Sequence, residues 1–294
     1  MKYTEVADSD CAIAQALGVV GDWWTLLVVR DVAGGVCRFD ELQRELGVSR
    51  KVLAERLAAL VEHGVLEKVP YQQHPPRHEY RLTSAGQGLM PVLIALQEWG
   101  TRWVLGDGSL TATATPGATE TQRVRQLVGT RIPPLELAGA GDAARDPVGD
   151  AQWTVLYCYP GAYAESAAYP VGWGEIPGAR GCTLESVTYR DRLGDFADRG
   201  AEVVGVSTQR PDEQAAFAAK ERIRFPLVSD QDLRMAAALR LPTFRAAGAD
   251  RLKRATLVVR HDREIRGVLY PISDPAGSVD DALRLLDKAR RSSR

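Results

Sequence analysis

The sequence predicts two domains of different fold class, a mostly helical α+β domain followed by an α/β domain built around a central sheet. Three observations support this prediction. At 294 residues the chain is too long for one average domain and sufficient for two. Apolar residues recur mostly with helical spacing in the first third, whereas short apolar runs alternate with amphipathic stretches in the remainder. Between these parts, GDGSLTATATPGATETQ is small, polar and low in complexity.

We therefore expect a first domain at 1–108, a linker at 109–121 and a second domain at 122–294. Hydrophobic residues make up 45% of the chain and charged residues 26%, which is ordinary for a globular protein. The sequence shows neither a long uncharged apolar run nor the features of a secretory signal. The four cysteines are scattered and match no zinc-binding spacing or disulfide framework. We expect a cytoplasmic protein with no metal, cofactor or membrane partner.

The first domain is predicted to begin with helices in DCAIAQALGVVGDWWTLLVVRDVAGG, followed by a short helix in RFDELQREL. Ser49 is a suitable N-cap for the next helix, RKVLAERLAALVEHG, whose apolar stripe includes Leu53, Leu57 and Leu60. Two strand-like runs, VLEKVPYQ and RHEYRLT, come next. One long helix is expected across SAGQGLMPVLIALQEWGTRWVLG. Helix, turn, helix and two-stranded ribbon is the layout of a winged helix-turn-helix, whose second helix enters the DNA major groove.

The candidate DNA contacts lie on this second helix and at the tip of the ribbon. If the leucines face inward, the basic side chains of the helix are available outward, and its N-terminus favours phosphate. The first 108 residues hold 11 Lys and Arg against 14 Asp and Glu, so any positive surface must be local. A solvated helix face is the alternative for these charges. The candidates are Ser49, Arg50, Lys51, Arg56, His74, Arg77 and His78.

The stretch from Cys11 to Leu89 resembles the HxlR family of winged helix-turn-helix regulators. The landmarks that carry the resemblance are GDWWTLLVVRD, RFDEL, GVSRKVL, LVEHGVLEK and PPRHEYRLT. The resemblance implies a homodimer, joined through terminal helices, that reads a two-fold related operator in double-stranded DNA. In some members a cysteine at the place of Cys11 senses oxidants, but we favour a small buried residue of the dimer helix. Cys37 is expected to be structural.

The second domain is predicted from strand-helix alternation. QWTVLYCYP and GAEVVGVST are nearly continuous apolar runs, typical of strands buried on both faces. Amphipathic helices are expected in LESVTYRDRLGDFADRG and DEQAAFAAKERIR, a hairpin in RATLVVRHDREIRGVLYP and a terminal helix in SVDDALRLLDKARR. The Arg and Lys residues of RAAGADRLKR are expected to be solvated. The aromatic residues around 153–173 either line a pocket or, as we favour, fill a core.

Cys182 stands at the predicted start of a helix. The preceding Pro177, Gly178 and Gly181 mark a turn, and the following TLESVTYRDRLGDF is helical. Unpaired N–H groups of a first helical turn, and cations nearby, lower the pKa of a thiol and make it nucleophilic. From these residues alone, a reactive Cys182 and an inert Cys182 are almost equally expected.

The stretches TVLYCYP, GCTLESVTYRDRLGDF, VVGVSTQ and FPLVSD resemble peroxiredoxins of the bacterioferritin-comigratory type, which have the thioredoxin fold. The resemblance covers roughly Gln122 to Ala289. It implies that Cys182 attacks a peroxide, that Arg254 stabilises the thiolate, and that Pro160 is the active-site proline. Thr183 completes the GCT turn. The resulting sulfenic acid would need a thiol reductant.

The chain departs from that family at three places. Ala179 stands where members carry a threonine, Val187 stands where many carry a resolving cysteine, and the insert GAYAESAAYPVGWGEIPGAR separates Pro160 from Cys182. Cys158 is a possible secondary redox thiol, although a buried sheet cysteine is the interpretation we favour.

Three functional hypotheses follow. The first is a redox-responsive DNA-binding transcriptional regulator whose peroxiredoxin-like domain senses peroxide or thiol oxidants through Cys182. The alternative is a one-cysteine thiol peroxidase fused to a DNA-binding domain without redox gating. The third is a degenerate redoxin domain that serves only dimerisation or ligand binding.

Overall fold

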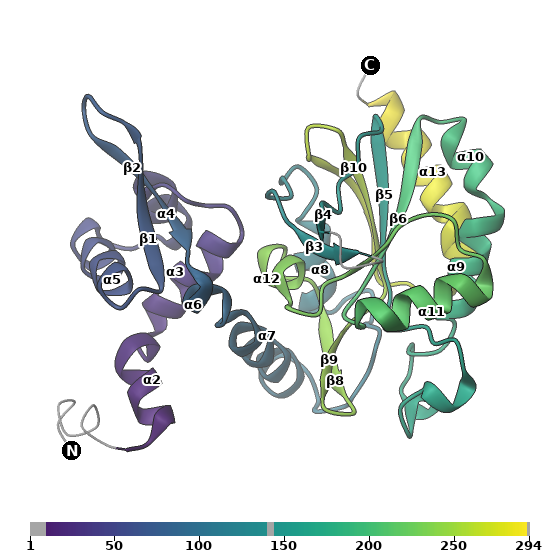
Figure 1. Ribbon diagram of the computed structural model, residues 1–294, viewed down its shortest axis with the longest axis horizontal. Helices are drawn as coiled ribbons and strands as arrows, with labels where there is room; N and C mark the ends of the chain where they lie inside the picture. The colour runs from purple at the N-terminus through teal and green to yellow at the C-terminus, as the bar shows by residue number, and fades with distance from the viewer. Residues whose placement is uncertain (1–9, 140–143, 293–294) are drawn as a thin grey trace. The chain divides into compact units, whose positions relative to one another are not determined.

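The computed structural model describes residues 10–139 and 144–292 (Figure 1). The chain divides into two compact units, Met1–Leu93 and Ile94–Arg294, which are described separately below. Within the described residues, no single helix is long and apolar enough to cross a membrane. One bent pair, Ala12–Val20 with Trp23–Ala33 at 74°, meets that length and composition test only when taken together.

Four helices open the first unit, and their ends follow local sequence signals. Helix α2 (Ala12–Val20) is followed by α3 (Trp23–Ala33), which begins where Asp22 accepts the N–H of Trp24. Helix α4 (Phe39–Leu46) ends at Gly47, which has a left-handed φ of 62°. Ser49 caps α5 (Arg50–Glu62) by accepting the N–H of Val52, as predicted. The predicted leucine stripe of α5 is buried.

The predicted ribbon follows α5. Strands β1 (Leu66–Gln72) and β2 (Arg77–Leu82) pair antiparallel, with Leu66 opposite Leu82. The single long helix expected after them is wrong. The chain forms the short α6 (Ser84–Gln87), then α7 (Met90–Trp99) and a π-helical turn, Gly100–Val104.

Pro91, the second residue of α7, contributes to the break in this helix because it has no N–H to donate to the Gln87 carbonyl, and two glycines precede it. A Cβ on Gly86 would lie 2.3 Å from the Val65 carbonyl oxygen, and Gly88 is the C-cap of α6. Glycine is also a weak helix former, by about 1 kcal/mol relative to alanine. Helix, turn, helix and ribbon nevertheless stand in the order expected of an α+β winged helix-turn-helix.

The second unit is a thioredoxin-like α/β domain. After α8 (Thr119–Arg125) it forms a seven-stranded sheet, in which β5, β6 and β7 are parallel and the other pairs are antiparallel. All six residues of the central β5 are buried, as its continuous apolar run predicts. In spatial order the strands are β11 (Ile265–Leu269), β10 (Ala255–Arg260), β5 (Trp153–Cys158), β6 (Ala201–Ser207), β7 (Leu227–Ser229), β3 (Leu137–Gly139) and β4 (Ala144–Arg145).

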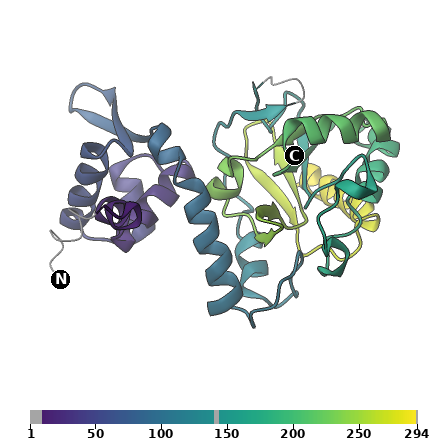
Figure 2. The same ribbon diagram turned by 60° about the horizontal axis from the view of Figure 1, so that its bottom comes forward.

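Helices cover both faces of this sheet. Figures 1 and 2 show α9, α10 and α13 on one side and α8 and α12 on the other. A separate hairpin, β8 (Thr243–Ala246) and β9 (Ala249–Leu252), precedes β10, and two short 3-10 turns lie in the insert before Cys182. The helix bounds are α9 (Cys182–Asp191), α10 (Leu193–Ala197), α11 (Pro211–Glu221), α12 (Arg234–Ala238) and α13 (Gly277–Arg291).

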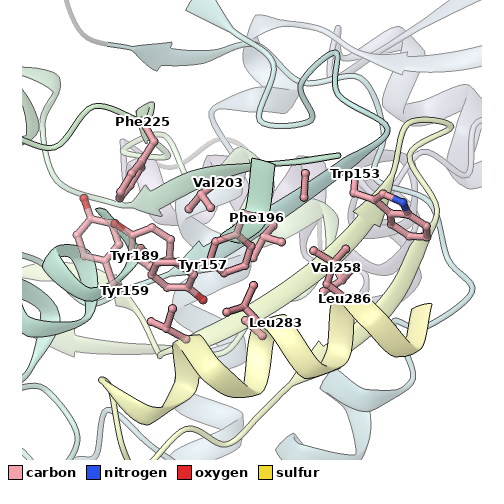
Figure 3. Close-up of a cluster of buried hydrophobic side chains, with 14 of the residues drawn as sticks. Trp153, Tyr157, Tyr159, Tyr189, Phe196, Val203, Phe225, Val258, Leu283 and Leu286 are labelled. Carbon is pink, nitrogen blue, oxygen red and sulfur yellow. The ribbon is translucent and has the colours of Figure 1, made fainter. Parts of the chain in front are cut away.

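An aromatic core lies between β5 and helices α9, α10 and α13 (Figure 3). The ring of Tyr157 stacks on Tyr189 at 4.5 Å and on Tyr159 at 5.3 Å between centroids. Trp153 and Cys182 are buried in the same cluster. The interpretation of these aromatic residues as core therefore agrees with the structure, and the candidate nucleophile is part of that core.

The sequence predicts that two stretches are exposed to solvent. In the structure, parts of both are buried in the second unit. In the segment expected as a linker, Ala112 and Thr121 are 0% exposed and Glu120 is buried. The expectation that the cations of 245–254 are solvated is wrong for Arg251 and Lys253, which are also buried. Their burial is possible because Lys253 pairs with Glu120 and Arg251 lies over the Trp173 ring.

Candidate functional site

Cys182 is the first residue of α9, where the sequence predicts a helix start. Gly181, the N-cap, has a φ of 100° that glycine adopts without strain, and a Cβ there would lie 2.6 Å from Pro275. The Cys182 side chain is 2% exposed, and its thiol donates to the Ala179 carbonyl at 3.5 Å. The sulfur is therefore closed off from solvent in this conformation.

Arg254 contacts the sulfur, as the resemblance implies. Its Nη2 lies 3.4 Å from Cys182 Sγ and 3.0 Å from the carbonyl oxygen of Arg180. Its Nη1 donates to Glu185, which lies one helical turn after the cysteine and also accepts a bond from Ser278. The sequence reasoning missed Glu185 and Ser278 because their contacts with this site depend on the tertiary fold.

The electrostatic balance at Cys182 differs from the sequence prediction. Burial raises the pKa of the Cys182 thiol, while the Arg254 guanidinium and a hydrogen bond from the Gly161 N–H lower it. The net direction is upward, and the Glu185 carboxylate adds to it. Burial also raises the pKa of Glu185 to about 7, against the opposing effect of Arg254. The predicted guanidinium contact is present, but it does not outweigh desolvation in the closed site.

The loop after β5 forms one wall of the site. Pro160 is buried at the end of this strand, and Gly161 follows it. The next residue, Ala162, forms two hydrogen bonds with the buried Gln209 side chain. Its N–H donates to Gln209 Oε1 at 2.8 Å, and its carbonyl accepts from Gln209 Nε2 at 2.9 Å. The carboxamide of Gln209 thus fixes the start of the insert against β6.

The insert supplies the opposite wall. Thr183 does not contact the sulfur in the hydrogen bonds of the described residues; its hydroxyl pairs with Tyr169 of the insert at 3.2 Å. Ala179 is fully buried and packs with Trp173 and Phe244. Alanine at this position provides no hydroxyl group to the site.

The remaining cysteines differ in their burial. Cys158 is 1% exposed, and burial raises the pKa of its thiol strongly. Its strand neighbours Tyr157 and Tyr159 belong to the core cluster that holds Cys182, and alternating side chains place Cys158 on the other face of the sheet. Cys11 is exposed in the single chain, and Cys37 is half-buried.

The first unit presents the candidate DNA contacts at the start of α5 and on the ribbon. Lys51 is exposed. Arg50 donates to Asp40 at 3.1 Å and is also exposed. Arg56 is only half-exposed and forms an ion pair with Asp22 at 3.1 Å, which holds α5 against the start of α3. Of the ribbon residues, His74 and Arg77 are exposed and His78 is half-buried.

Some of the candidate DNA contacts line a groove of about 390 Å³. It lies between α4, the start of α5 and the ribbon, and its walls include Arg50, Arg77 and His78 from the predicted set. Three cations that sequence reasoning missed also line it, namely Arg38, Arg44 and Lys68. They are separated from the recognition helix in sequence, so helix periodicity alone does not indicate them.

Comparisons with known proteins divide the chain in the same way. The model of the HxlR-like helix-turn-helix family matches residues 19–107, and that of the AhpC/TSA family matches residues 176–268. An uncharacterized HTH-type transcriptional regulator of Mycobacterium tuberculosis is 45% identical over 93 residues, which are 32% of this chain and 59% of that protein. The uncharacterized HTH-type regulator YtfH of Escherichia coli is 36% identical over 100 residues, 34% of this chain and 79% of its own.

Solved peroxiredoxin structures are similar to the second part. Peroxidoxin BcpB from Mycobacterium tuberculosis is 28% identical with a TM-score of 0.45, covering 55% of this chain and 96% of that one. Peroxiredoxin Q from Xanthomonas campestris is 25% identical with a TM-score of 0.42, covering 52% and 90%. The chain thus matches less than two thirds of the length of the mycobacterial regulator and nearly all of the two peroxiredoxins.

Proposed function

The chain belongs to the HxlR-like helix-turn-helix family through its first part and to the AhpC/TSA family through its second, and we propose that it is a redox-responsive transcriptional regulator. Oxidation of Cys182 by a peroxide changes the affinity of the protein for DNA. The observation that carries the proposal is the contact between Arg254 and the Cys182 sulfur, at 3.4 Å, in a chain that also bears a cation-lined winged-helix groove.

The chemistry assigned to Cys182 is a two-electron oxidation. The thiolate attacks one oxygen of the peroxide ROOH, an S–O bond forms and the O–O bond breaks. The leaving alkoxide takes a proton and departs as ROH, while the sulfur becomes a sulfenic acid. Arg254 stabilises the thiolate and the charge that develops on the leaving oxygen. A small thiol then condenses with the sulfenic acid and releases water, and a second thiol reduces the mixed disulfide.

The DNA-binding part of the proposal assigns α5 to the major groove of an operator read by a homodimer in the cytoplasm. Exposed Lys51 and Arg50 at the start of α5, with Arg77 and His74 on the ribbon, contact phosphates or bases. Arg56 is assigned a mainly structural part because Asp22 engages it. The cations of the groove supply the local positive charge that this weakly acidic half requires.

The test measures DNA affinity in both redox states. Duplexes are selected from a random pool by the reduced full-length protein, and their affinity is measured before and after one equivalent of hydrogen peroxide, for wild type and Cys182→Ser. We expect an affinity change of about fivefold to a hundredfold in wild type, the usual range of coupling between sites, and none in the variant. Peroxide-indifferent binding by wild type, with Cys182 shown to be oxidised, would refute the switch.

The alternative, a one-cysteine thiol peroxidase without gating, predicts rapid peroxide consumption with an added thiol. The burial of Cys182 and its raised thiol pKa lower the fraction of thiolate, which disfavours rapid turnover. Sustained turnover together with constant DNA affinity would decide for the peroxidase.

A further inference from the structure

The segment immediately after the matched helix-turn-helix region is bound to the turn that precedes Cys182. We call residues 110–113 the strap. Within it, Ala112 is 0% exposed and its N–H donates to the Pro177 carbonyl at 2.8 Å. The Thr111 hydroxyl lies 3.4 Å from the same oxygen. The side chain of Ala112 packs in one cluster with Trp173 and Ala179 of the insert.

The contact between the strap and this turn leaves no spare volume. Gly178 has a φ of 82°, and a Cβ built on it would lie 2.9 Å from Thr113 Cβ and 3.2 Å from the Ala112 carbonyl carbon. Real Cβ atoms do not approach other heavy atoms so closely. The strap therefore fits only while the turn at 177–179 keeps its present path.

The same turn forms the cover of Cys182. The Cys182 thiol donates to the Ala179 carbonyl at 3.5 Å, and Arg254 donates to the next carbonyl, that of Arg180, at 3.0 Å. Because Cys182 is 2% exposed and Ala179 0%, an added oxygen on the sulfur has no free space to enter. It also removes the S–H donor. The cover of Cys182 must therefore shift when the sulfur is oxidised, and it is the surface to which the strap is bound.

The chain after the strap is anchored independently. The buried Glu120 carboxylate accepts two bonds from Lys253 Nζ, at 3.0 and 3.1 Å, and one from the Tyr270 hydroxyl. Breaking a buried pair of this kind leaves an uncompensated charge and is strongly unfavourable. The strap is thus held from two directions. Lys253, the cation of this buried pair, also donates to the Thr113 carbonyl of the strap at 3.4 Å, and the turn before Cys182 binds Ala112.

We propose that residues 110–113 form a redox-controlled strap, held on the 177–179 turn while Cys182 is reduced and released when Cys182 becomes a sulfenic acid. Release frees residues 110–112 from the turn, within the segment that runs from α7, whose Gln97 donates to the Leu241 carbonyl at 2.7 Å, to the anchor at Glu120. The inference rests on the proposed function, because peroxide oxidation of Cys182 is its trigger. It adds the route by which that oxidation reaches the DNA-binding half.

Hydrogen exchange of the full-length protein tests this route. Exchange is followed by mass spectrometry in peptides that cover 109–118, before and after one equivalent of hydrogen peroxide. We expect exchange at the strap to become about tenfold faster or more in oxidised wild type and to stay slow in peroxide-treated Cys182→Ser.

A matched pair of glycine variants tests the contact without oxidation. Gly178→Ala places a methyl group against the strap and should accelerate its exchange in the reduced protein. Gly172→Ala is the control, because Gly172 also has a left-handed φ, 75°, but its nearest non-local neighbour is a Glu175 oxygen at 3.9 Å. Equal acceleration in both variants would assign the effect to backbone strain and contradict the strap contact.

The two proposals fail differently. Unchanged strap exchange in protein whose Cys182 is oxidised overturns the strap, even if DNA affinity responds. Faster strap exchange with unchanged DNA affinity supports the strap and overturns the redox-responsive regulator. Faster exchange together with changed affinity, both abolished by Cys182→Ser, supports both.

Discussion

Glu185 lies one helical turn after Cys182, and both side chains contact the guanidinium of Arg254. One cation therefore faces two groups that can each become an anion, and ionisation of either disfavours ionisation of the other. Burial raises the pKa of Glu185 to about 7, so this carboxyl changes its charge near neutral pH. The protonation state of Glu185 thus governs how far Arg254 can stabilise a thiolate at Cys182.

Replacement of Glu185 by glutamine should make Cys182 more reactive. The variant removes the competing carboxylate and leaves Arg254 to the sulfur, so we expect the pKa of the thiol to fall and alkylation by iodoacetamide at pH 7 to become about tenfold faster. The pH profile of alkylation measures this change. Glu175→Gln, which removes an exposed carboxylate from the insert, should leave the profile unchanged. An unaltered profile in Glu185→Gln would show that this carboxylate does not control the thiol.

Cys158 should remain unmodified while Cys182 reacts. It is 1% exposed, on the other face of the sheet, and burial raises the pKa of its thiol. We expect its alkylation in the folded protein to be on the order of a hundredfold slower than that of Cys182, as mass spectrometry of both cysteines after timed labelling would show. Cys158→Ser should give the same Cys182 oxidation products as wild type. Detection of a Cys158–Cys182 disulfide in folded protein would contradict the assigned faces.

The second unit should lose stability as the pH rises toward neutrality. Asp230 is fully buried, accepts the N–H groups of Met235 and Ala236, and has a pKa raised by burial to about 7. An unfolded aspartate has a pKa of about 3.9, so between these values only the folded chain holds the proton. The stability that this proton provides is complete below the unfolded pKa and is lost as the pH rises through about 7. Glu185 acts in the same direction.

Urea unfolding at pH 5.5 and pH 8 checks this sign. Asp230→Asn removes the titration, so the drop in unfolding free energy between the two pH values should be smaller than in wild type by on the order of 2 kcal/mol. The lost hydrogen bond lowers stability at both pH values and does not affect the difference. Asp198→Asn, at an exposed position, serves as the control. The same pH dependence in wild type and Asp230→Asn would count against a buried, protonated Asp230.

Lys51 and Arg56, both predicted from sequence to contact DNA, should behave differently. Lys51→Ala should weaken binding to any duplex and reduce the slope of log affinity against log salt by about 1, with little effect on the melting temperature. Arg56→Ala breaks the ion pair with Asp22, so its main effect should be a lower melting temperature. The salt slope of DNA binding should change little. Lys288→Ala, on the exposed face of α13, controls for net charge. A reduced salt slope in Arg56→Ala with unchanged stability would restore Arg56 to the DNA-contacting set.

Local signals in the sequence predict most of the elements, although not the break between α6 and α7, and they predict the start of the site. The turn before Cys182 predicts the helix start at this residue, and Ser49 predicts the start of α5. The continuous apolar run of β5 predicts a central buried strand. These inferences succeed because capping and periodicity depend on residues a few positions apart. The contact of Arg254 with Cys182 came from the family resemblance and has no local signal.

The unpredicted features depend on distant residues. Lys253 pairs with Glu120 across 133 positions, and this pairing compensates the burial of a lysine from a basic run. The low complexity of the stretch that contains the strap predicts a linker, yet in the structure Thr113 and Ala112 pack closely against Gly178. Amino-acid composition gives the size of a side chain but does not show which residues it packs against. The net pKa of Cys182 was likewise unpredictable, since it depends on burial and on Glu185 together.

The placement of Cys158 and Cys182 on opposite faces of one sheet has a consequence for the duration of the response. These are the two cysteines of the second unit, and the sheet between them prevents either from serving as the other's partner. In the proposed regulator the oxidised form therefore has no disulfide within the second unit in which to be stored. Its lifetime is set by how fast thiols from the surroundings reach Cys182. Such a protein reports the ratio of hydroperoxide to available thiol at each moment and keeps no record of earlier exposure.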